Sequence, residues 1–164
     1  MKTYSLFILK PGFMAKKEEV LKLLDKNGIN VDVMEETVLG QEQVERHYEE
    51  HFGKPFYSTL VEYMTTGNVK GIFQFKPTCV KMVVSSKDKN ETEEDFIVRS
   101  RKVVKEVLRP ALTFNREKFA KLSDEDFKEL TMTANGIHAS DKPESAVKEI
   151  NNLFPDYFGA SEKE

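Results

Sequence analysis

This sequence has little cysteine, little net charge and no long apolar run. Its single cysteine, Cys79, rules out an internal disulfide framework. The 25 basic and 28 acidic residues nearly cancel, and no long block of one sign occurs, which argues against a surface for nucleic acid or an anionic membrane. A membrane-spanning helix needs roughly 20 apolar residues, far more than any run here. We therefore expect a soluble chain that holds a polyanionic ligand only through local groups.

Targeting signals and glycine-rich phosphate loops are also missing. No charged leader followed by an apolar run precedes the opening MKTYSLFILK, which together with the lone cysteine predicts a reducing, cytoplasmic setting. Neither G-x-x-x-x-G-K-[ST] nor G-x-G-x-x-G occurs. A phosphate site in this chain would have to be built from side chains.

What is present is enough for one globular domain, since 164 residues with 39% hydrophobic side chains can bury a sizeable core. The apolar run YSLFILK stops at Pro11 and predicts a buried strand followed by a loop. Residues 15–28 carry valine and leucine at helical spacing and end in Asn27 and Gly28, so they predict an amphipathic helix. The alternation over 29–39 predicts a second strand.

The middle and end of the chain predict further elements. Residues 40–53 and 54–68 favour two helices, and VKGIFQF at 69–75 predicts a third strand. The run CVKMVVSS fits either a strand or part of a hairpin, and both readings stay open. After it we expect a helix over 94–112, a charged helical or irregular stretch over 114–130, a short strand over 131–140, and a final helix over 142–158 with Ser140 or Asp141 as its N-cap.

Side chains that could do chemistry occur at three separate places: Lys10 at the end of the first strand, the helix that carries Tyr48, and the segment NGIHASD around His138. From its own sequence context, His138 could be a core residue, a metal ligand or a nucleophile. His47 and His51 lie at i and i+4, where both could face one ion, but no third ligand is evident nearby. The sequence therefore predicts no metal site made of protein ligands.

Three blocks of this sequence resemble the nucleoside diphosphate kinases: LKPG, VERHYEEHFGKPFYSTLVEYMTTGNV and NGIHASDKPESAVKEI. The last contains the family hallmark N-x-x-H-[GA]-S-D. The resemblance covers 2–75 and 131–158, whereas 76–130 does not match and looks divergent or inserted. It implies a single domain over 1–158, with 159–164 as a frayed tail. The implied fold is α/β, a ferredoxin-like α/β sandwich in which helices cover a small antiparallel sheet.

The activity that this resemblance implies is ping-pong transfer of a γ-phosphoryl group from a nucleoside triphosphate to a nucleoside diphosphate. His138 would be the phosphorylated nucleophile, Glu149 would orient it, Ser140 would support that carboxylate or the phosphate, and Lys10 would contact the transferring phosphate. Each of these residues alone would be unremarkable, as a strand end, a surface charge or a turn. Their joint occurrence in the family's order makes the enzyme reading the stronger one.

The resemblance also implies a nucleotide site. Tyr48 would bond near the phosphate, Phe56 would stack on the base, and Asn135 would contact the sugar. Family members use Mg²⁺, act on nucleoside triphosphates and diphosphates, and assemble as hexamers or tetramers, so we expect Mg²⁺ and a homo-oligomer here. The arginines that would clamp the phosphates are left open among three candidates: Arg99, Arg101 and Arg109.

Two departures from the family pattern bear on activity. The family's P-G-T-I-R loop is missing between Gly71 and His138, and Glu125 stands where its arginine would fall. Gly12 stands where family members usually have an aspartate after Lys-Pro. The alternative to an enzyme is therefore a nucleotide-binding regulatory module of the same fold with weak or no turnover.

Overall fold

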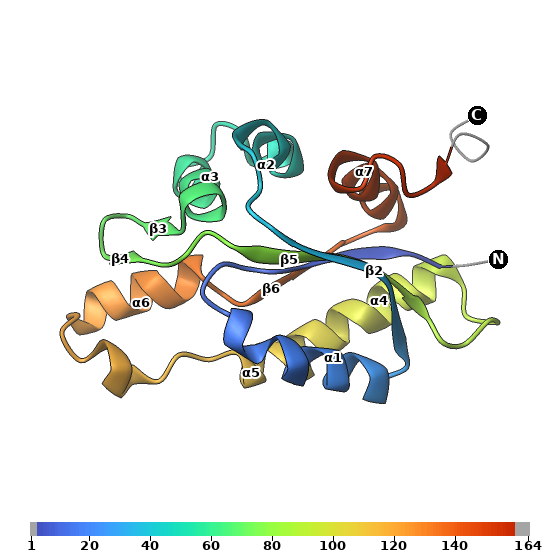
Figure 1. The fold of residues 1–164 in the computed structure, drawn as a ribbon, viewed down its shortest axis with the longest axis horizontal. Helices are drawn as coiled ribbons and strands as arrows, with labels where there is room; N and C mark the ends of the chain where they lie inside the picture. Colours follow the sequence, from blue (N-terminus) through green and yellow to red (C-terminus); the bar gives the residue numbers. More distant parts are fainter. Residues whose placement is uncertain (1–2, 160–164) are drawn as a thin grey trace.

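The computed structural model describes residues 3–159 and is built around one four-stranded antiparallel sheet with the strand order β2-β5-β1-β6 (Figure 1). The four strands are β1 (Ser5–Leu9), β2 (Ile29–Thr37), β5 (Cys79–Ser86) and β6 (Ile137–Ala139). The two central strands, β1 and β5, are buried along almost their whole length, and this is why their sequences are nearly continuous apolar runs. Edge strand β2 is buried at Ile29 and half-buried or exposed along the rest of its length, and a register shift between Val31 and Val33 interrupts the alternation that its sequence predicted.

Helices cover both faces of this sheet (Figure 1). On one face lie α1 (Lys17–Lys26), which joins β1 to β2, and α4 (Glu93–Val103), which begins the connection from β5 to β6. The opposite face is covered by α2 (Gln41–His47), α3 (Tyr57–Thr66) and α7 (Pro143–Leu153). Two strand-helix-strand units interleaved in this order form the ferredoxin-like arrangement, so the expected fold class is confirmed.

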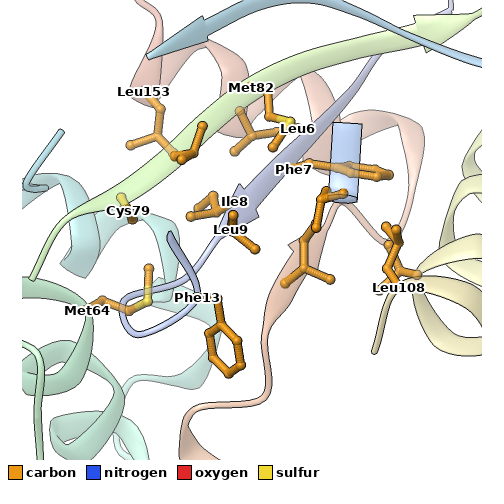
Figure 2. Packing of buried hydrophobic residues seen from close by; sticks show 14 of the residues in the cluster. Leu6, Phe7, Ile8, Leu9, Phe13, Met64, Cys79, Met82, Leu108 and Leu153 are labelled. Carbon is orange, nitrogen blue, oxygen red and sulfur yellow. The ribbon is translucent and has the colours of Figure 1, made fainter. Parts of the chain in front are cut away.

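Short helices complete the connections: η1 (Met14–Lys16), η2 (Glu49–His51), the π-helical segment η3 (Val104–Leu108), α5 (Arg109–Ala111), η4 (Arg116–Phe119) and α6 (Asp124–Thr133). The core lies around β1, whose side chains meet residues of β5, α3, α7 and Leu108 (Figure 2). Each fully buried leucine or phenylalanine there contributes about 1.5–3 kcal/mol through loss of exposed apolar surface.

The predicted third strand over 69–75 was wrong. That segment forms a separate hairpin of two short strands, β3 (Asn68–Val69) and β4 (Phe73–Gln74). The third strand of the main sheet is instead CVKMVVSS at 79–86, one of the two readings left open. The longer apolar run takes the central place because it can be covered on both faces, whereas the hairpin turns sharply through Lys70 and Gly71, both at positive φ.

This hairpin accounts for the unusual glycine at position 12. Gly12 has a φ of 99°, and a Cβ atom there would lie 2.8 Å from the ring of Phe75, which follows β4. An aspartate would face both the backbone strain and the steric clash. The glycine at position 12 therefore allows the chain after β4 to pack closely against the loop that follows β1.

Two further boundaries differ from expectation. The predicted strand over 131–140 begins only at Ile137, because α6 continues through Thr133. The N-cap of the last helix is Lys142 rather than Ser140 or Asp141. Ser140 does not cap this helix because its hydroxyl is engaged with β1 and with Glu149.

No helix within residues 3–159 is both long and apolar enough to cross a membrane. Of the expected frayed tail, Gly159 ends the described part, and residues 160–164 lie outside the described residues.

Candidate active site

His138 lies on the edge strand β6, directly opposite Ile8 of β1. Its Nε2 atom is 2.8 Å from Oε1 of Glu149 on α7, which is the partner that the sequence resemblance implied. A carboxylate can only accept a hydrogen bond, so Nε2 carries the ring proton. The lone pair of the neutral imidazole is therefore on Nδ1, where it can attack an electrophile.

Ser140 fixes this carboxylate from the other side. Its hydroxyl donates to the same Oε1 atom of Glu149 at 2.8 Å and accepts a hydrogen bond from the backbone N–H of Leu6 at 3.0 Å. The hydroxyl proton points at Glu149 because that acceptor is 2.8 Å away, whereas the other acceptor within reach, the carbonyl oxygen of Leu6, is 3.5 Å away. The three side chains form a chain of defined direction, from β1 through Ser140 and Glu149 to His138.

Burial keeps the His138 ring neutral. Burial, and after it the positive charge of Lys10, lower the pKa of His138 to about 3. Burial also raises the pKa of Glu149, partly offset by His47 and by the Ser140 hydrogen bond. A histidine with its pKa so far below neutrality has its Nδ1 lone pair available throughout the physiological pH range.

Lys10 follows β1 and is only 6% exposed, yet its Nζ atom makes one directed contact, a 2.7 Å hydrogen bond to Oδ1 of Asn135. Burial lowers the pKa of Lys10 to about 8, with a smaller contribution from the charge of Arg109. Such a buried cation is an incompletely compensated charge, and an incoming anion would relieve it.

A pocket of about 360 Å³ opens where Lys10 and His138 meet the long helix after β5. Besides these two residues, the basic side chains that line it are Arg101, Lys102, Lys105 and Arg109, and the remaining lining residues are Val104, Glu106 and Ala139. Five cations against one carboxylate make the pocket suited to a polyphosphate.

The π-helical segment explains how Arg101 and Arg109 reach the same pocket. In a regular α-helix, residues eight positions apart lie about 80° apart around the axis. The segment Val104–Leu108 hydrogen-bonds in the wider i to i+5 pattern and turns less per residue, which returns Arg109 toward the face of Arg101. No feature of the sequence signals this turn, and for that reason the pocket residues Lys102 and Lys105 were also missed.

The third candidate arginine, Arg99, does not line this pocket. Its guanidinium bonds Glu91 through Nε at 2.8 Å and the backbone carbonyl of Gly28 at 3.1 Å. Arg99 thereby ties α4 to the start of β2. The structure thus separates the candidate arginines into two at the pocket and one in a structural ion pair.

The two aromatic candidates lie on the α2 and α3 side. Tyr48 is buried, and its hydroxyl has no hydrogen-bond partner within residues 3–159. Phe56 precedes α3 and is 45% exposed, with the His51 ring 5.2 Å away and Lys54 over its face. An unpaired buried hydroxyl and a half-exposed aromatic face are both suited to receiving a ligand.

Comparison with known proteins adds an independent observation. A family model described as nucleoside diphosphate kinase matches residues 3–157. The chain belongs to the nucleoside diphosphate kinase family. The match runs through 76–130, the stretch for which the sequence motifs gave no correspondence.

Individual members of the nucleoside diphosphate kinase family show the same relationship. A nucleoside diphosphate kinase from Archaeoglobus fulgidus is 33% identical over 138 residues, covering 84% of this chain and 76% of the relative. One from Thermobifida fusca is 31% identical, covering 93% of this chain and 96% of the relative. The crystal structure of the Aquifex aeolicus nucleoside diphosphate kinase superposes on this chain with a TM-score of 0.63 at 23% sequence identity. The match covers 94% of this chain and 96% of the Aquifex chain, and it shows that the two share a fold.

The placement of the arginines gives a testable contrast. Arg109→Ala is expected to lower kcat/KM by about 10- to 100-fold with little change in stability, since it removes an exposed cation from the lining of the basic pocket. Arg99→Ala is expected to leave kcat/KM within about twofold but to lower the free energy of unfolding by about 1–3 kcal/mol, because it removes the ion pair with Glu91 and the hydrogen bond to the Gly28 carbonyl. Steady-state kinetics and urea unfolding of both variants measure this contrast. A loss of kcat/KM in Arg99→Ala with none in Arg109→Ala would contradict the assignment.

Proposed function

We propose that this chain is a nucleoside diphosphate kinase that transfers the γ-phosphoryl group of a nucleoside triphosphate to a nucleoside diphosphate through a phosphohistidine at His138. One observation carries the proposal: Glu149 holds Nε2 of a neutral imidazole at 2.8 Å, which leaves Nδ1 free on a side chain that lines a strongly basic pocket. Membership in the nucleoside diphosphate kinase family supports the same reading. None of the comparisons favours the alternative of a regulatory module.

The reaction runs in two half-reactions. In the first, the Nδ1 lone pair attacks the terminal phosphorus, the bond to the bridging oxygen breaks, and the nucleoside diphosphate leaves with that electron pair. In the second, a terminal oxygen of another nucleoside diphosphate attacks the phosphohistidine, and the electron pair of the P–N bond returns to Nδ1. Since phosphoryl transfer depends on alignment and charge neutralisation, Lys10, Arg101 and Arg109 are the groups suited to stabilising the transferring phosphoryl oxygens.

Glu149 and Ser140 act on the phosphorylated ring. Once Nδ1 bears the phosphoryl group while Nε2 keeps its proton, the ring carries positive charge. The Glu149 carboxylate beside Nε2 stabilises that charge and holds the ring orientation, as a triad carboxylate does. Ser140 keeps the carboxylate in place through its 2.8 Å hydrogen bond, so it is a positioning residue.

The nucleoside would be bound by the remaining candidates. Asn135 already bonds Lys10 and is suited to a sugar hydroxyl, Tyr48 offers its unpaired hydroxyl, and the half-exposed Phe56 offers a face for the base. Stacking on an aromatic face tolerates any base. We therefore expect broad specificity among nucleotides.

Mg²⁺ fits this pocket as a companion of the nucleotide. Of the described residues that line the pocket, Glu106 alone has a carboxylate, whereas Mg²⁺ in phosphoryl-transfer sites is bound largely by phosphate oxygens and water. When bound, it would neutralise phosphate charge together with the basic side chains. The protein's own share is to hold the phosphates and the nucleophile.

A labelling experiment tests the proposal. Incubation with a γ-³²P-labelled nucleoside triphosphate is expected to give a protein-bound label that is acid-labile, alkali-stable and removed by a nucleoside diphosphate. His138→Ala is expected to abolish the label, whereas His51→Ala, at one of the two other histidines, is expected to retain it. Nucleotide binding without any label would overturn the proposal in favour of the regulatory module.

Two further expectations stay predictions. Assembly into a homo-hexamer or homo-tetramer is checked by light scattering of the purified chain. A cytoplasmic location is checked by cell fractionation.

A further inference from the structure

His47 is a half-buried histidine for which the proposed reaction has no use. Both of its ring nitrogens are shielded from solvent, and neither has a hydrogen-bond partner among residues 3–159. Its ring packs edge-on against that of His138, with 4.4 Å between the ring centroids. A buried polar atom without a partner costs about 1–3 kcal/mol, so the position calls for a physical explanation.

Three potential ligands converge at this point. One nitrogen of His47, one nitrogen of His138 and one carboxylate oxygen of Glu149 lie within 4.8 Å of one another. Two imidazoles and a carboxylate form the ligand set with which proteins hold zinc while leaving a fourth position open. The sequence predicted no such site because it paired His47 with His51, whereas the fold brings β6 and α7 to His47.

We propose that His47, His138 and Glu149 form a site for a borderline divalent transition metal such as Zn²⁺, and that its occupation inhibits the phosphohistidine reaction. Zinc bonds of about 2.0–2.1 Å in a tetrahedral arrangement require ligand atoms about 3.3 Å apart. From their present limit of 4.8 Å, the ligand atoms need to draw together by at most about 1.5 Å. Mg²⁺ would not compete, because it prefers oxygen ligands in octahedral geometry.

The metal has its own route to these ligands. A second pocket, of about 300 Å³, lies between α2 and α7 and is lined by both His47 and Glu149. The carboxylates that line this pocket, Glu49, Glu50 and Glu149, outnumber its two basic side chains, Arg46 and Lys148, although Glu49 pairs with Lys148. The phosphate pocket is lined by His138 but by neither His47 nor Glu149. Metal and nucleotide therefore approach the catalytic histidine through different pockets.

Inhibition follows from the tautomer of His138. A metal that binds Nε2 takes the place of the proton now directed at Glu149. The ring stays neutral when that proton leaves to solvent and Nδ1 takes one up, so Nδ1 becomes an N–H group with no lone pair. This consequence rests on the proposed function, whereas metal binding itself does not.

Calorimetric titration of the full chain with ZnCl₂, without nucleotide, tests the site. One Zn²⁺ per chain is expected to bind, and His47→Phe is expected to weaken that binding on the order of 100-fold through loss of a ligand. His51→Phe is the matched control, because it makes the same change one helical turn away and outside the ligand group. Equal Zn²⁺ affinity in the two variants, or no stoichiometric binding to the wild-type chain, would overturn the proposal.

Two measurements on the wild-type chain keep the test independent of how the variant folds. Co²⁺ is expected to give the visible absorption of a four-coordinate nitrogen and oxygen site. In ring ¹⁵N NMR spectra, addition of Zn²⁺ is expected to shift the proton of His138 from Nε2 to Nδ1. An unchanged His138 tautomer at saturating Zn²⁺ contradicts the site, even if phosphohistidine formation is never observed.

The functional consequence is measured separately. In the labelling reaction, Zn²⁺ is expected to suppress formation of the phosphohistidine in the wild-type chain at concentrations that fill the calorimetric site, with Mg²⁺ in excess. His51→Phe is expected to be inhibited equally. Binding without suppression of the label would overturn the inhibitory part of the proposal.

Discussion

Lys10→Met is expected to lower kcat/KM by about 100- to 1000-fold and, at the same time, to make the folded chain more stable. The loss of activity follows because a buried ammonium group at the pocket is a preorganised cation for the transferring phosphate. Methionine retains the apolar length of the side chain and removes only the charge and its hydrogen bond to Asn135.

The gain in stability follows from the lowered pKa of Lys10. Burial brings that pKa from 10.5 in an exposed lysine to about 8, so holding the charge in the folded state at neutral pH costs up to about 3 kcal/mol. Between pH 8 and 10.5 the unfolded chain keeps a proton that the folded chain has released. Stability of the native chain therefore rises with pH across this window, and the full cost is present below it.

Urea unfolding at pH 7 and at pH 10 measures this effect in both chains. The stability gain of Lys10→Met is expected to be about 1–3 kcal/mol at pH 7 and to shrink toward pH 10, since the lost Asn135 hydrogen bond offsets part of it. Lys102→Met is the matched control, because Lys102 lines the same pocket but is exposed. A destabilised Lys10→Met chain would show that the ammonium is compensated in the folded protein.

Lys10 also predicts the alkaline limb of the activity profile. Because kcat/KM reports the ionisation of the free enzyme, it is expected to fall above pH 8 as Lys10 loses its proton. The arginine of Lys10→Arg keeps its charge at every accessible pH, so this variant is expected to lack the alkaline limb. Its kcat/KM is expected to reach a lower plateau than that of the wild-type chain. An alkaline limb that is unchanged in Lys10→Arg would assign the limb to another group.

Local patterns in the sequence were enough for the elements that carry the nucleophile, and they failed where the fold depends on distant contacts. The apolar run of β1 and the alternation of β2 identified those strands, because burial on both faces or on one face leaves a direct pattern. The run at 69–75 has the same composition as a strand, and only its competition with β5 for the sheet assigned it to a hairpin. In α6 the sequence was less clear than the structure. The many charged residues over 124–133 obscured the helical spacing of its apolar side chains, so that stretch was left as helical or irregular.

The candidate site divides in the same way. The resemblance to the nucleoside diphosphate kinases named the members of the His138, Glu149 and Ser140 group, and their hydrogen bonds now join them. The choice among three arginines required the π-helical segment, whose wider turn has no residue signature. His47 was read against its neighbour His51 on the same helix, because the approach of β6 to α2 is a tertiary contact that sequence spacing does not contain.

Glu149→Ala is expected to have the second of the two largest effects, on both activity and stability. Removing the carboxylate leaves the Nε2–H of His138 and the hydroxyl of Ser140 without their shared acceptor in a buried site. Two unsatisfied donors together lower the free energy of unfolding by about 2–4 kcal/mol. Part of this loss is offset because the variant no longer buries a carboxylate, and the cost of burying that charge is seen in the raised pKa of Glu149. The ring is then free to turn or to change tautomer, and the rate of phosphohistidine formation is expected to fall by about 100- to 10,000-fold.

Glu149→Gln separates the two roles of this carboxylate. The amide oxygen of glutamine can still accept from His138 and Ser140, so stability is expected to stay within about 1 kcal/mol of the wild-type chain. The negative charge opposite the phosphorylated ring is lost, so kcat is expected to fall by about 10- to 100-fold, with KM little changed. Glu144→Ala, on the exposed face of the same helix, is the control for general effects on α7 and is expected to keep full activity. If Glu149→Ala and Glu149→Gln lose equal activity, the charge alone matters. Full activity in Glu149→Ala would mean that the carboxylate orients nothing and that the Nδ1 lone pair of His138 is secured by another group.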